Sequence, residues 1–306
     1  MSLYLAIDSG GTKTRCLLAD ETRILARAAA GSIKLMRVGE TEATARLKVM
    51  LTEVSQTAGV SLGEITQTCI GLAAFTIEAV RVWAEREIGN LVGGKLLIVG
   101  DEEIALDGAF RGGPGILVVA GTGSIVQGRA ADGTLYRAGG WGPAIGDEGS
   151  GFWIGQEALR AAFWAHDRGV ATTLLTEIGE LWGAKSLGEI VEIANATPAP
   201  DLPALAPIVT RCADAGDELA IAILNRAGVE LSEMVALVAL RMKESGGKRT
   251  PDAAYTGSVL ENISLVRASM VAALKKSSPR VRVLDGAVDA LEGALWRARE
   301  AGKSAS

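Results

Sequence analysis

The chain has 306 residues, of which 48% are hydrophobic and 22% charged; this is an ordinary globular composition, long enough for two domains with sizeable cores. Its formal net charge of −5 argues against a general nucleic-acid or anionic-membrane surface, although backbone amides can still hold a phosphate. The sequence contains no apolar run of about 18 residues, and its first residues lack the basic and apolar stretches of a signal peptide, so we expect none. We therefore expect a cytoplasmic protein with no nucleic-acid or membrane partner.

The three cysteines, Cys16, Cys69 and Cys212, are far apart in the sequence. Scattered cysteines do not predict a disulfide framework, and the absence of a CxxC pair argues against zinc or an iron–sulfur cluster. We expect all three to be small buried hydrophobic side chains.

The first thirty residues predict a Gly-rich hairpin. Residues 3–7 read as a buried strand that ends at Asp8, and residues 15–19 and 23–30 read as the next two strands. The turn between the first two, residues 9–14 (SGGTKT), can present successive amides and a hydroxyl to phosphate oxygens. Asp8 at the strand end can hold Mg²⁺ through water. A plain surface hairpin is the alternative at this point.

A helix and a strand end follow. Residues 40–58 carry Ala43, Leu47, Met50, Leu51 and Val54 at helical spacing. Residues 95–99 (KLLIV) predict a buried strand, and a helical pattern starts just after Asp101. Ligands of α/β sheets gather at such strand ends. Asp101 is therefore either the N-cap of this helix or a catalytic base.

The opening pattern then recurs. Residues 115–120 form a strand, GTGS a turn, and residues 125–130 and 134–138 two further strands, matching the first thirty residues element by element. An internal duplication of this size indicates two similar α/β halves, each with one phosphate-facing hairpin directed to a cleft between them.

The most glycine-rich stretch is residues 139–155, GGWGPAIGDEGSGFWIG, with seven glycines. Such a run suits a backbone that turns sharply or approaches a ligand closely. Trp141, Asp147 and Glu148 lie within it and supply an aromatic face and carboxylates for a polyhydroxylated ligand. Ser150 is placed to cap the helix that follows. A loop that only turns a corner is the other interpretation.

The rest of the second half reads as mostly helical. Residues 196–207 hold four of the eight prolines and predict a bent surface connector. Residues 261–275 predict one helix, residues 280–284 a strand, and residues 286–301 a last helix.

Four motifs in this order resemble the actin-like ATPase and sugar-kinase superfamily, and within it the N-acetylglucosamine kinase branch, the BadF/BadG/BcrA/BcrD-type ATPases. They are IDSGGTKT at residues 7–14, AGTGS at 120–124, GGWGPAIGDEGSG at 139–151 and YTGSV at 255–259. The resemblance implies an α/β fold of two duplicated actin-like (ribonuclease H-like) ATPase domains. The N-terminal one would take residues 1–114 plus about 286–306, and the C-terminal one residues 115–285.

The resemblance also implies residue roles. Asp8 matches the acidic residue near Mg²⁺, and Asp101 the general base that acts on a sugar hydroxyl. The positions that match the contacts to ATP are Gly10, Gly11, Thr12, Lys13, Gly121, Thr122, Gly123, Ser124, Gly257 and Ser258. Those that match the sugar site are Trp141, Gly142 and Asp147, with Glu148 either contacting the sugar or bracing the loop.

The implied activity is ATP- and Mg²⁺-dependent phosphorylation of a small amino sugar, N-acetylglucosamine to its 6-phosphate first of all. A kinase of glucosamine or N-acetylmuramic acid, an activator ATPase of a 2-hydroxyacyl-CoA dehydratase and a non-catalytic sugar sensor are the alternatives. The family often carries an Asn that meets the sugar where this chain has Lys34, either an exposed loop lysine or a group that meets an anionic substituent. The resemblance is also compatible with a homodimer.

Overall fold

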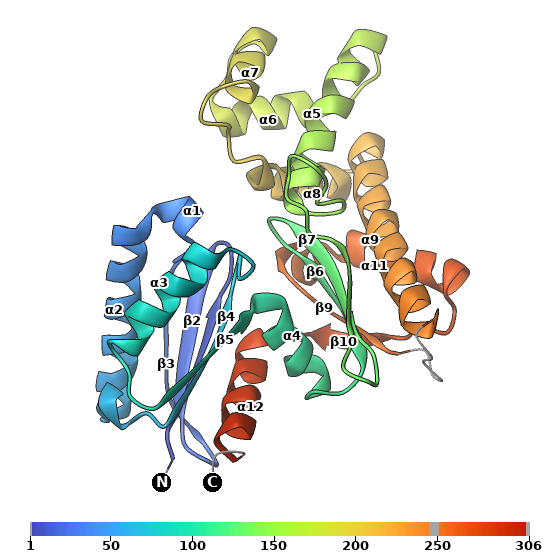
Figure 1. Ribbon diagram of the computed structural model, residues 1–306. Helices are drawn as coiled ribbons and strands as arrows, with labels where there is room; N and C mark the ends of the chain where they lie inside the picture. Colours follow the sequence, from blue (N-terminus) through green and yellow to red (C-terminus); the bar gives the residue numbers. More distant parts are fainter. Residues whose placement is uncertain (1, 245–250, 304–306) are drawn as a thin grey trace. The chain divides into compact units, whose positions relative to one another are not determined.

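The computed structural model describes residues 2–244 and 251–303, which form two compact units (Figure 1). The first unit comprises the described residues of Met1–Gly115 and Val288–Ser306, and the second comprises those of Ile116–Ala287. The chain thus leaves the first unit once and returns to it with its last helix.

The first unit is a five-stranded mixed sheet in the order β3-β2-β1-β4-β5. β2 runs antiparallel to β1 and β3, whereas β1, β4 and β5 are parallel. Buried side chains of α2 and α3 pack with Leu5 and Ile7 of β1, while α4 and α12 pack against β1 and β4. The elements are β1 (Tyr4–Ser9), β2 (Lys13–Ala19), β3 (Ile24–Gly31), α1 (Leu35–Val38), α2 (Glu40–Ala58), η1 (Leu62–Glu64), β4 (Gln67–Leu72), α3 (Glu78–Gly89), β5 (Lys95–Gly100), α4 (Asp101–Phe110) and α12 (Ala290–Lys303).

The second unit has a sheet in the order β10-β9-β6-β7-β8, in which β6, β9 and β10 are parallel. A helical segment between β8 and β9 covers it, and α9 and α11 pack along each other. The elements are β6 (Gly115–Ala120), β7 (Ser124–Arg129), β8 (Leu135–Gly139), α5 (Gly151–Arg168), α6 (Leu174–Trp182), α7 (Leu187–Ala194), η2 (Leu202–Leu205), α8 (Ala206–Asp214), α9 (Glu218–Glu244), β9 (Ala253–Thr256), α10 (Ser258–Asn262), α11 (Ser264–Ser277) and β10 (Val283–Ala287).

The two sheets have the same topology. In each of them the strands, numbered by their order within the unit, lie side by side as third, second, first, fourth and fifth. The α/β class and the duplication expected from the two Gly/Thr hairpins are therefore confirmed. The second unit differs chiefly by its longer helical insertion.

Local sequence patterns predicted several elements correctly. α2 covers the expected residues and buries the five apolar side chains expected to point inward, because they lie on one stripe of the helix. Ser150 caps α5 by accepting the amide hydrogen of Trp153 at 3.2 Å. No helix in the described ranges 2–244 and 251–303 is long and apolar enough to cross a membrane.

Other expectations were wrong. The connector expected over residues 196–207 ends in η2, and Pro207 lies in the first turn of α8, a position that tolerates proline because its N–H has no helical partner. The helix expected over residues 261–275 is two helices, α10 and α11, separated at Ile263. Residues 283–287 are the strand β10, so the last helix begins at Ala290.

Candidate active site

Asp8 and Asp101 lie at one edge of the first sheet. Ser9 at the end of β1 pairs in register with Leu72 of β4, which pairs with Gly100 of β5. The carboxyl ends of the three parallel strands therefore meet at the same edge, where ligands of α/β sheets gather. Gly71 of β4 lets the start of α4 approach the sheet closely, because a Cβ there would lie 2.2 Å from Ile104 Cδ1 and 3.2 Å from Asp101 Cα.

Asp101 is the first residue of α4, and the N-cap is Gly100, so the structure does not support the N-cap reading of Asp101. The pKa of the Asp101 carboxyl is raised well above its usual range, first by burial and then by the neighbouring acids Glu102 and Asp8. A buried carboxylate with a raised pKa is a stronger base than an exposed one, which suits it to accept a proton.

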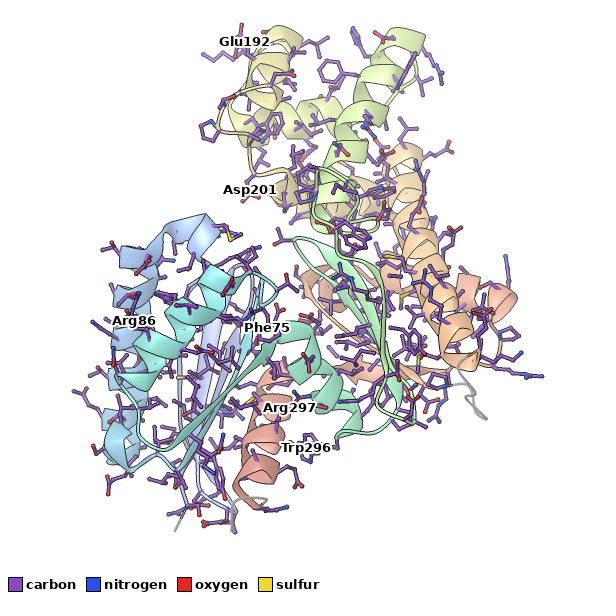
Figure 2. The ribbon with its side chains drawn as sticks, in the orientation of Figure 1. Phe75, Arg86, Glu192, Asp201, Trp296 and Arg297 are labelled. Atoms are coloured by element: carbon purple, nitrogen blue, oxygen red, sulfur yellow. The ribbon has the colours of Figure 1, made fainter. Side chains whose placement is uncertain are left out.

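α4 is fixed from behind by the last helix. Arg297 of α12 donates to Asp107 at 2.5 Å and to Glu103 at 3.2 Å, and Asp107 is fully buried (Figure 2). Gly293 of α12 has no room for a side chain, since a Cβ there would be 1.8 Å from the carbonyl oxygen of Ile104. The close contact and the ion pairs hold the helix that starts with Asp101.

Asp8 is paired with a cation. Arg15 Nη2 lies 2.7 Å from Asp8 Oδ2 and 3.0 Å from Oδ1 of Asp289, just before α12. Burial raises the pKa of the Asp8 carboxyl, and the Arg15 guanidinium opposes that rise. Sequence reasoning missed Arg15 and Asp289, because nothing in the local pattern shows that residues near opposite ends of the chain meet.

The first Gly/Thr turn is exposed at its tip. Thr12 and Lys13 are exposed, and a Cβ added at Gly11 would meet nothing within 4 Å, so packing within the protein does not demand glycine there. Arg37 of α1 reaches this turn, with Nη1 3.4 Å from the carbonyl oxygen of Gly11. Lys34 precedes α1 and is half-buried, and its ammonium group has no ion-pair or hydrogen-bond partner among residues 2–244 and 251–303.

The second Gly/Thr turn is held by α5. The amides of Gly151 and Phe152 donate to the carbonyl oxygens of Gly121 and Thr122 at 2.8 and 3.2 Å. The hydroxyl of Ser124 is buried and donates to the carbonyl oxygen of Glu148 at 2.7 Å, so it braces the loop. Thr122 is exposed at the tip of this anchored turn.

Gly257 lies beside this turn, and two features of its position require glycine. Its φ is +101°, and a Cβ there would be 2.4 Å from the carbonyl oxygen of Ala120. β9 is parallel to β6, so Gly257 and Ser258 lie at the same sheet edge as Gly121 and Thr122.

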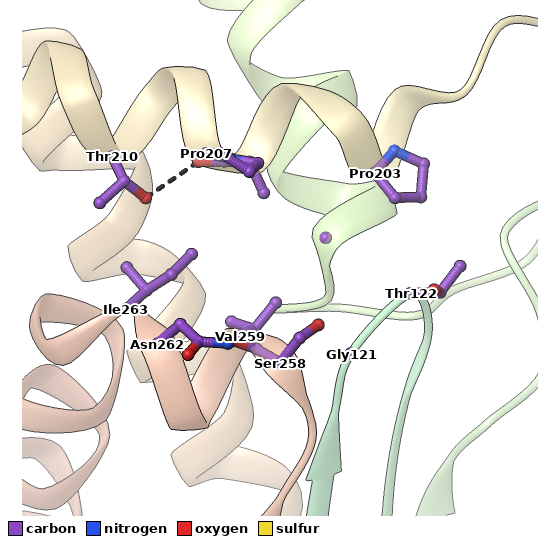
Figure 3. A pocket seen from close by; sticks show the side chains of 11 residues that line it. Gly121, Thr122, Pro203, Pro207, Thr210, Ser258, Val259, Asn262 and Ile263 are labelled. Atoms are coloured by element: carbon purple, nitrogen blue, oxygen red, sulfur yellow. Dashed lines mark hydrogen bonds between the residues drawn. The ribbon is translucent and has the colours of Figure 1, made fainter. Parts of the chain in front are cut away.

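A cavity of about 290 Å³ opens at this edge (Figure 3). Gly121, Thr122 and Ser258 form one wall with α10, and the start of α8 forms the other. The wall formed by Pro203, Pro207 and Thr210 was missed from the sequence, since the prolines were taken for a connector. The cavity combines apolar faces with a few hydroxyls, as small-molecule sites commonly do.

The loop from Gly139 to Gly151 carries the expected aromatic and acidic groups. Trp141 is 63% exposed, and the guanidinium of Arg137 lies 4.4 Å from the centre of its ring. Gly142 has φ +88° and Asp147 φ +70°, so this backbone is held in a conformation that non-glycine residues seldom adopt. Asp147 is 6% exposed, and a Cβ at Gly123 would be 2.8 Å from its Oδ2. The structure thus brings Asp147 against the second Gly/Thr turn.

The three thiols take no part in these sites. Cys16, Cys69 and Cys212 are buried and unpaired, as expected, and burial raises the pKa of Cys16 and Cys69 to about 12. No cluster of three or more His, Cys, Asp or Glu side chains suited to a metal ion occurs in the described part of the chain.

Two α/β units of the same topology, each with a Gly/Thr turn, are the architecture that the four motifs led us to expect of an actin-like ATPase. The family model of the BadF/BadG/BcrA/BcrD ATPases matches residues 5–298, so the chain belongs to this ATPase family. The match confirms the family expected from the four motifs and, with it, an enzyme that uses ATP.

The chain is similar to known sugar kinases over nearly its whole length. An N-acetylmuramic acid/N-acetylglucosamine kinase of Clostridium acetobutylicum is 31% identical, covering 98% of this chain and 99% of the relative. An N-acetyl-D-glucosamine kinase of Dictyostelium discoideum is 27% identical, covering 95% and 96%. The crystal structure of a candidate N-acetylglucosamine kinase from Chromobacterium violaceum has a TM-score of 0.75 and 27% identity, covering 96% and 98%.

Proposed function

We propose that this protein is an ATP-dependent amino-sugar kinase that transfers the γ-phosphoryl group to a hydroxyl of N-acetylglucosamine, the 6-hydroxyl by resemblance. The observation that carries the proposal is Asp101, a half-buried carboxyl at the strand-end edge whose pKa is raised by its surroundings. The names of the two curated relatives support the substrate class.

Asp101 is the general base in this proposal. It accepts the proton of the attacking hydroxyl as the bond to phosphorus forms, a role typically worth about 10²–10⁴-fold in rate. Phosphoryl transfer otherwise needs positioning and charge stabilisation more than covalent help. The Arg297 ion pairs to α4 keep the base in place.

The second unit holds the nucleotide. Its cavity at Gly257 and Ser258 accepts the nucleoside between α8 and α10, and the anchored turn presents the exposed Thr122 and its hydroxyl to the phosphates. In the first unit, the open turn at Gly10, Gly11 and Thr12 does the same.

The residues present fit a Mg²⁺ ion that arrives with the nucleotide. Mg²⁺ keeps several waters and is commonly bound by one or two carboxylates plus substrate phosphates. Asp8 supplies such a carboxylate, with Asp101 and Asp289 adding to the negative potential around it. When bound, the ion would neutralise charge on the phosphates.

The sugar binds at the loop from Gly139 to Gly151 in this proposal. The exposed ring of Trp141 offers a face for the sugar ring, and Gly142 lets the backbone come close. The buried carboxylate of Asp147 accepts hydrogen bonds from sugar hydroxyls.

An ADP-release assay over a panel of sugars tests the proposal. N-acetylglucosamine is expected to be the best of N-acetylglucosamine, N-acetylmuramic acid, glucosamine, N-acetylmannosamine and glucose. Turnover on none of them, together with tight sugar binding, would favour a sugar sensor instead.

Lys34 supports N-acetylmuramic acid as a second substrate, because that sugar carries a carboxylate and the Lys34 ammonium group has no partner in residues 2–244 and 251–303. Lys34→Asn is expected to lower kcat/KM for N-acetylmuramic acid by about fivefold, the value of a half-exposed ion pair, and to leave that for N-acetylglucosamine unchanged. Equal losses on both sugars would contradict this role.

The activator ATPase alternative is disfavoured by the thiols. Those activators, by resemblance, hold a bridging cluster on closely placed cysteines, whereas Cys16, Cys69 and Cys212 are buried and far apart in the sequence, with Cys212 in the other unit. Iron bound stoichiometrically to purified protein would revive it.

A further inference from the structure

Arg15 is shared between two carboxylates. The same nitrogen, Nη2, lies 2.7 Å from Asp8 Oδ2 and 3.0 Å from Asp289 Oδ1. The guanidinium Nε is buried and has no hydrogen-bond partner in the described part of the chain. The two carboxylates therefore compete for the same nitrogen, so a closer contact with one of them weakens the ion pair with the other.

Asp289 is held firmly where it stands. Its Oδ1 also accepts the amide hydrogen of Leu291 in the first turn of α12 at 3.1 Å. Its carbonyl oxygen lies against α4, since a Cβ at Gly108 would be 2.7 Å from it. Asp289 is thus held by the start of α12 and by α4 at the place where it contacts the Arg15 guanidinium.

The charges around Asp8 are unbalanced. Asp8, Asp289 and Asp101 are acidic, and the charge of Asp8 is one of the causes that raise the pKa of Asp101. Arg15 is the cation that is paired directly with Asp8 and Asp289. A divalent cation arriving at Asp8 would face the Arg15 guanidinium at close range, where repulsion between charges is strong.

We propose that Asp289 is a positioning residue that keeps Arg15 paired when the Asp8 carboxylate turns to the divalent cation of the bound nucleotide. The inference rests on the proposed function, which makes Asp8 the carboxylate facing that cation. Before the nucleotide binds, Arg15 neutralises Asp8. Afterwards Arg15 keeps its partner at Asp289, so its charge stays compensated and competes less with the incoming ion.

Removing the charge of Asp289 tests the inference. Asp289→Asn keeps an oxygen for the amide of Leu291 but leaves Arg15 to Asp8 alone. Calorimetric titration of Mn²⁺ into the protein saturated with ADP is expected to give a Kd about fivefold weaker, the value of a half-exposed ion pair. The melting temperature should be unchanged.

Glu292→Gln is the matched control. Glu292 lies in the first turn of α12, three residues after Asp289, and loses the same charge, but it pairs with the exposed Arg27. Its Mn²⁺ affinity is expected to equal that of the wild type.

A double variant separates positioning from simple loss of charge. In an Arg15→Gln background, adding Asp289→Asn should leave the Mn²⁺ affinity unchanged, because Asp289 then has no cation to hold. Wild-type affinity in Asp289→Asn, or the same fivefold loss in both backgrounds, would overturn the inference. A wild-type protein that binds no metal–nucleotide complex would overturn the proposed function, and this inference with it.

Discussion

The two units share one strand order, but the strand-end edges of their sheets carry different side chains. The edge of the first sheet holds the acids Asp8, Asp101 and Glu102 with the cation Arg15. At the corresponding turn of the second sheet, the carbonyl oxygens of Gly121 and Thr122 accept amide hydrogens of α5, and the carboxylate of Asp147 lies against Gly123. In the proposed function, the first edge supplies the general base and the carboxylate that faces the metal ion, and the second edge holds the nucleotide.

The two Gly/Thr turns also differ in how they are held. The amides of Gly151 and Phe152 fix the second turn from behind, whereas Gly11 in the first turn meets Arg37 through a long hydrogen bond. We therefore expect substitutions in the first unit to act on the rate of chemistry, and those in the second on nucleotide affinity.

The largest expected effect is in the first unit. Asp101→Asn removes the base but keeps the shape of the side chain, so kcat should fall by about 10²–10⁴-fold. Dissociation constants for ATP and sugar, measured by calorimetry, should stay within about twofold of the wild type. A variant that keeps more than about a tenth of wild-type turnover would contradict the assignment of Asp101 as base.

A large effect is expected at Gly257 in the second unit. Gly257→Ala must place a Cβ against the Ala120 carbonyl at positive φ, so the nucleotide loop should shift and KM for ATP should rise about tenfold or more. Gly11→Ala is the matched substitution in the first unit, where the added Cβ meets no protein atom. Thermal melting should detect a loss of stability for Gly257→Ala alone, and equal melting temperatures would argue against the difference between the turns.

A smaller effect is expected in stability. Because the pKa of Asp101 is raised in the folded state, that state holds the proton more tightly, and stability falls as pH rises from the unfolded pKa of about 4 through the folded one. Without Mg²⁺ or nucleotide, Asp101→Asn should raise the melting temperature at pH 8 by about 2–4 °C for each kcal/mol relieved. The gain should vanish near pH 4, and a lower melting temperature at pH 8 would show that burial of this carboxyl carries no cost.

The smallest effect is expected at the sugar loop. Arg137 lies over Trp141 and donates to the carbonyl oxygens of Gly139 and Gly140 at 3.2 and 3.0 Å. Arg137→Met should raise KM for the sugar about threefold and leave kcat and KM for ATP unchanged, since an exposed cation–π contact is worth about 0.5–1 kcal/mol. A change in KM for ATP of the same size would place Arg137 at the nucleotide instead.

Local sequence patterns predicted what depends on near neighbours. The α2 stripe, the Ser150 cap and the duplicated hairpins follow from spacing within a few residues. Asp101 could be placed at a strand end, but the N-cap interpretation could be set aside only after the structure showed that Gly100 is the N-cap; its role as base stays a prediction.

What depends on distant parts of the chain was not predicted. Asp289 meets Arg15 only because the last helix returns to the first unit. The wall of the cavity formed by η2 and α8 was not predicted, because Pro203 and Pro207 are compatible with both a connector and a helix start. Nothing in the local sequence shows that Gly71 must be glycine, because the atoms that leave no room for a side chain there belong to α4.

The division of labour between the units is tested most directly by steady-state kinetics on two variants, Asp101→Asn and Thr122→Val, with ATP and N-acetylglucosamine. The account predicts that Asp101→Asn lowers kcat by at least about 10²-fold with little change in KM for ATP, and that Thr122→Val raises KM for ATP several-fold with a much smaller change in kcat. Turnover of Asp101→Asn close to that of the wild type, or a loss of kcat in Thr122→Val as large as in Asp101→Asn, would contradict it.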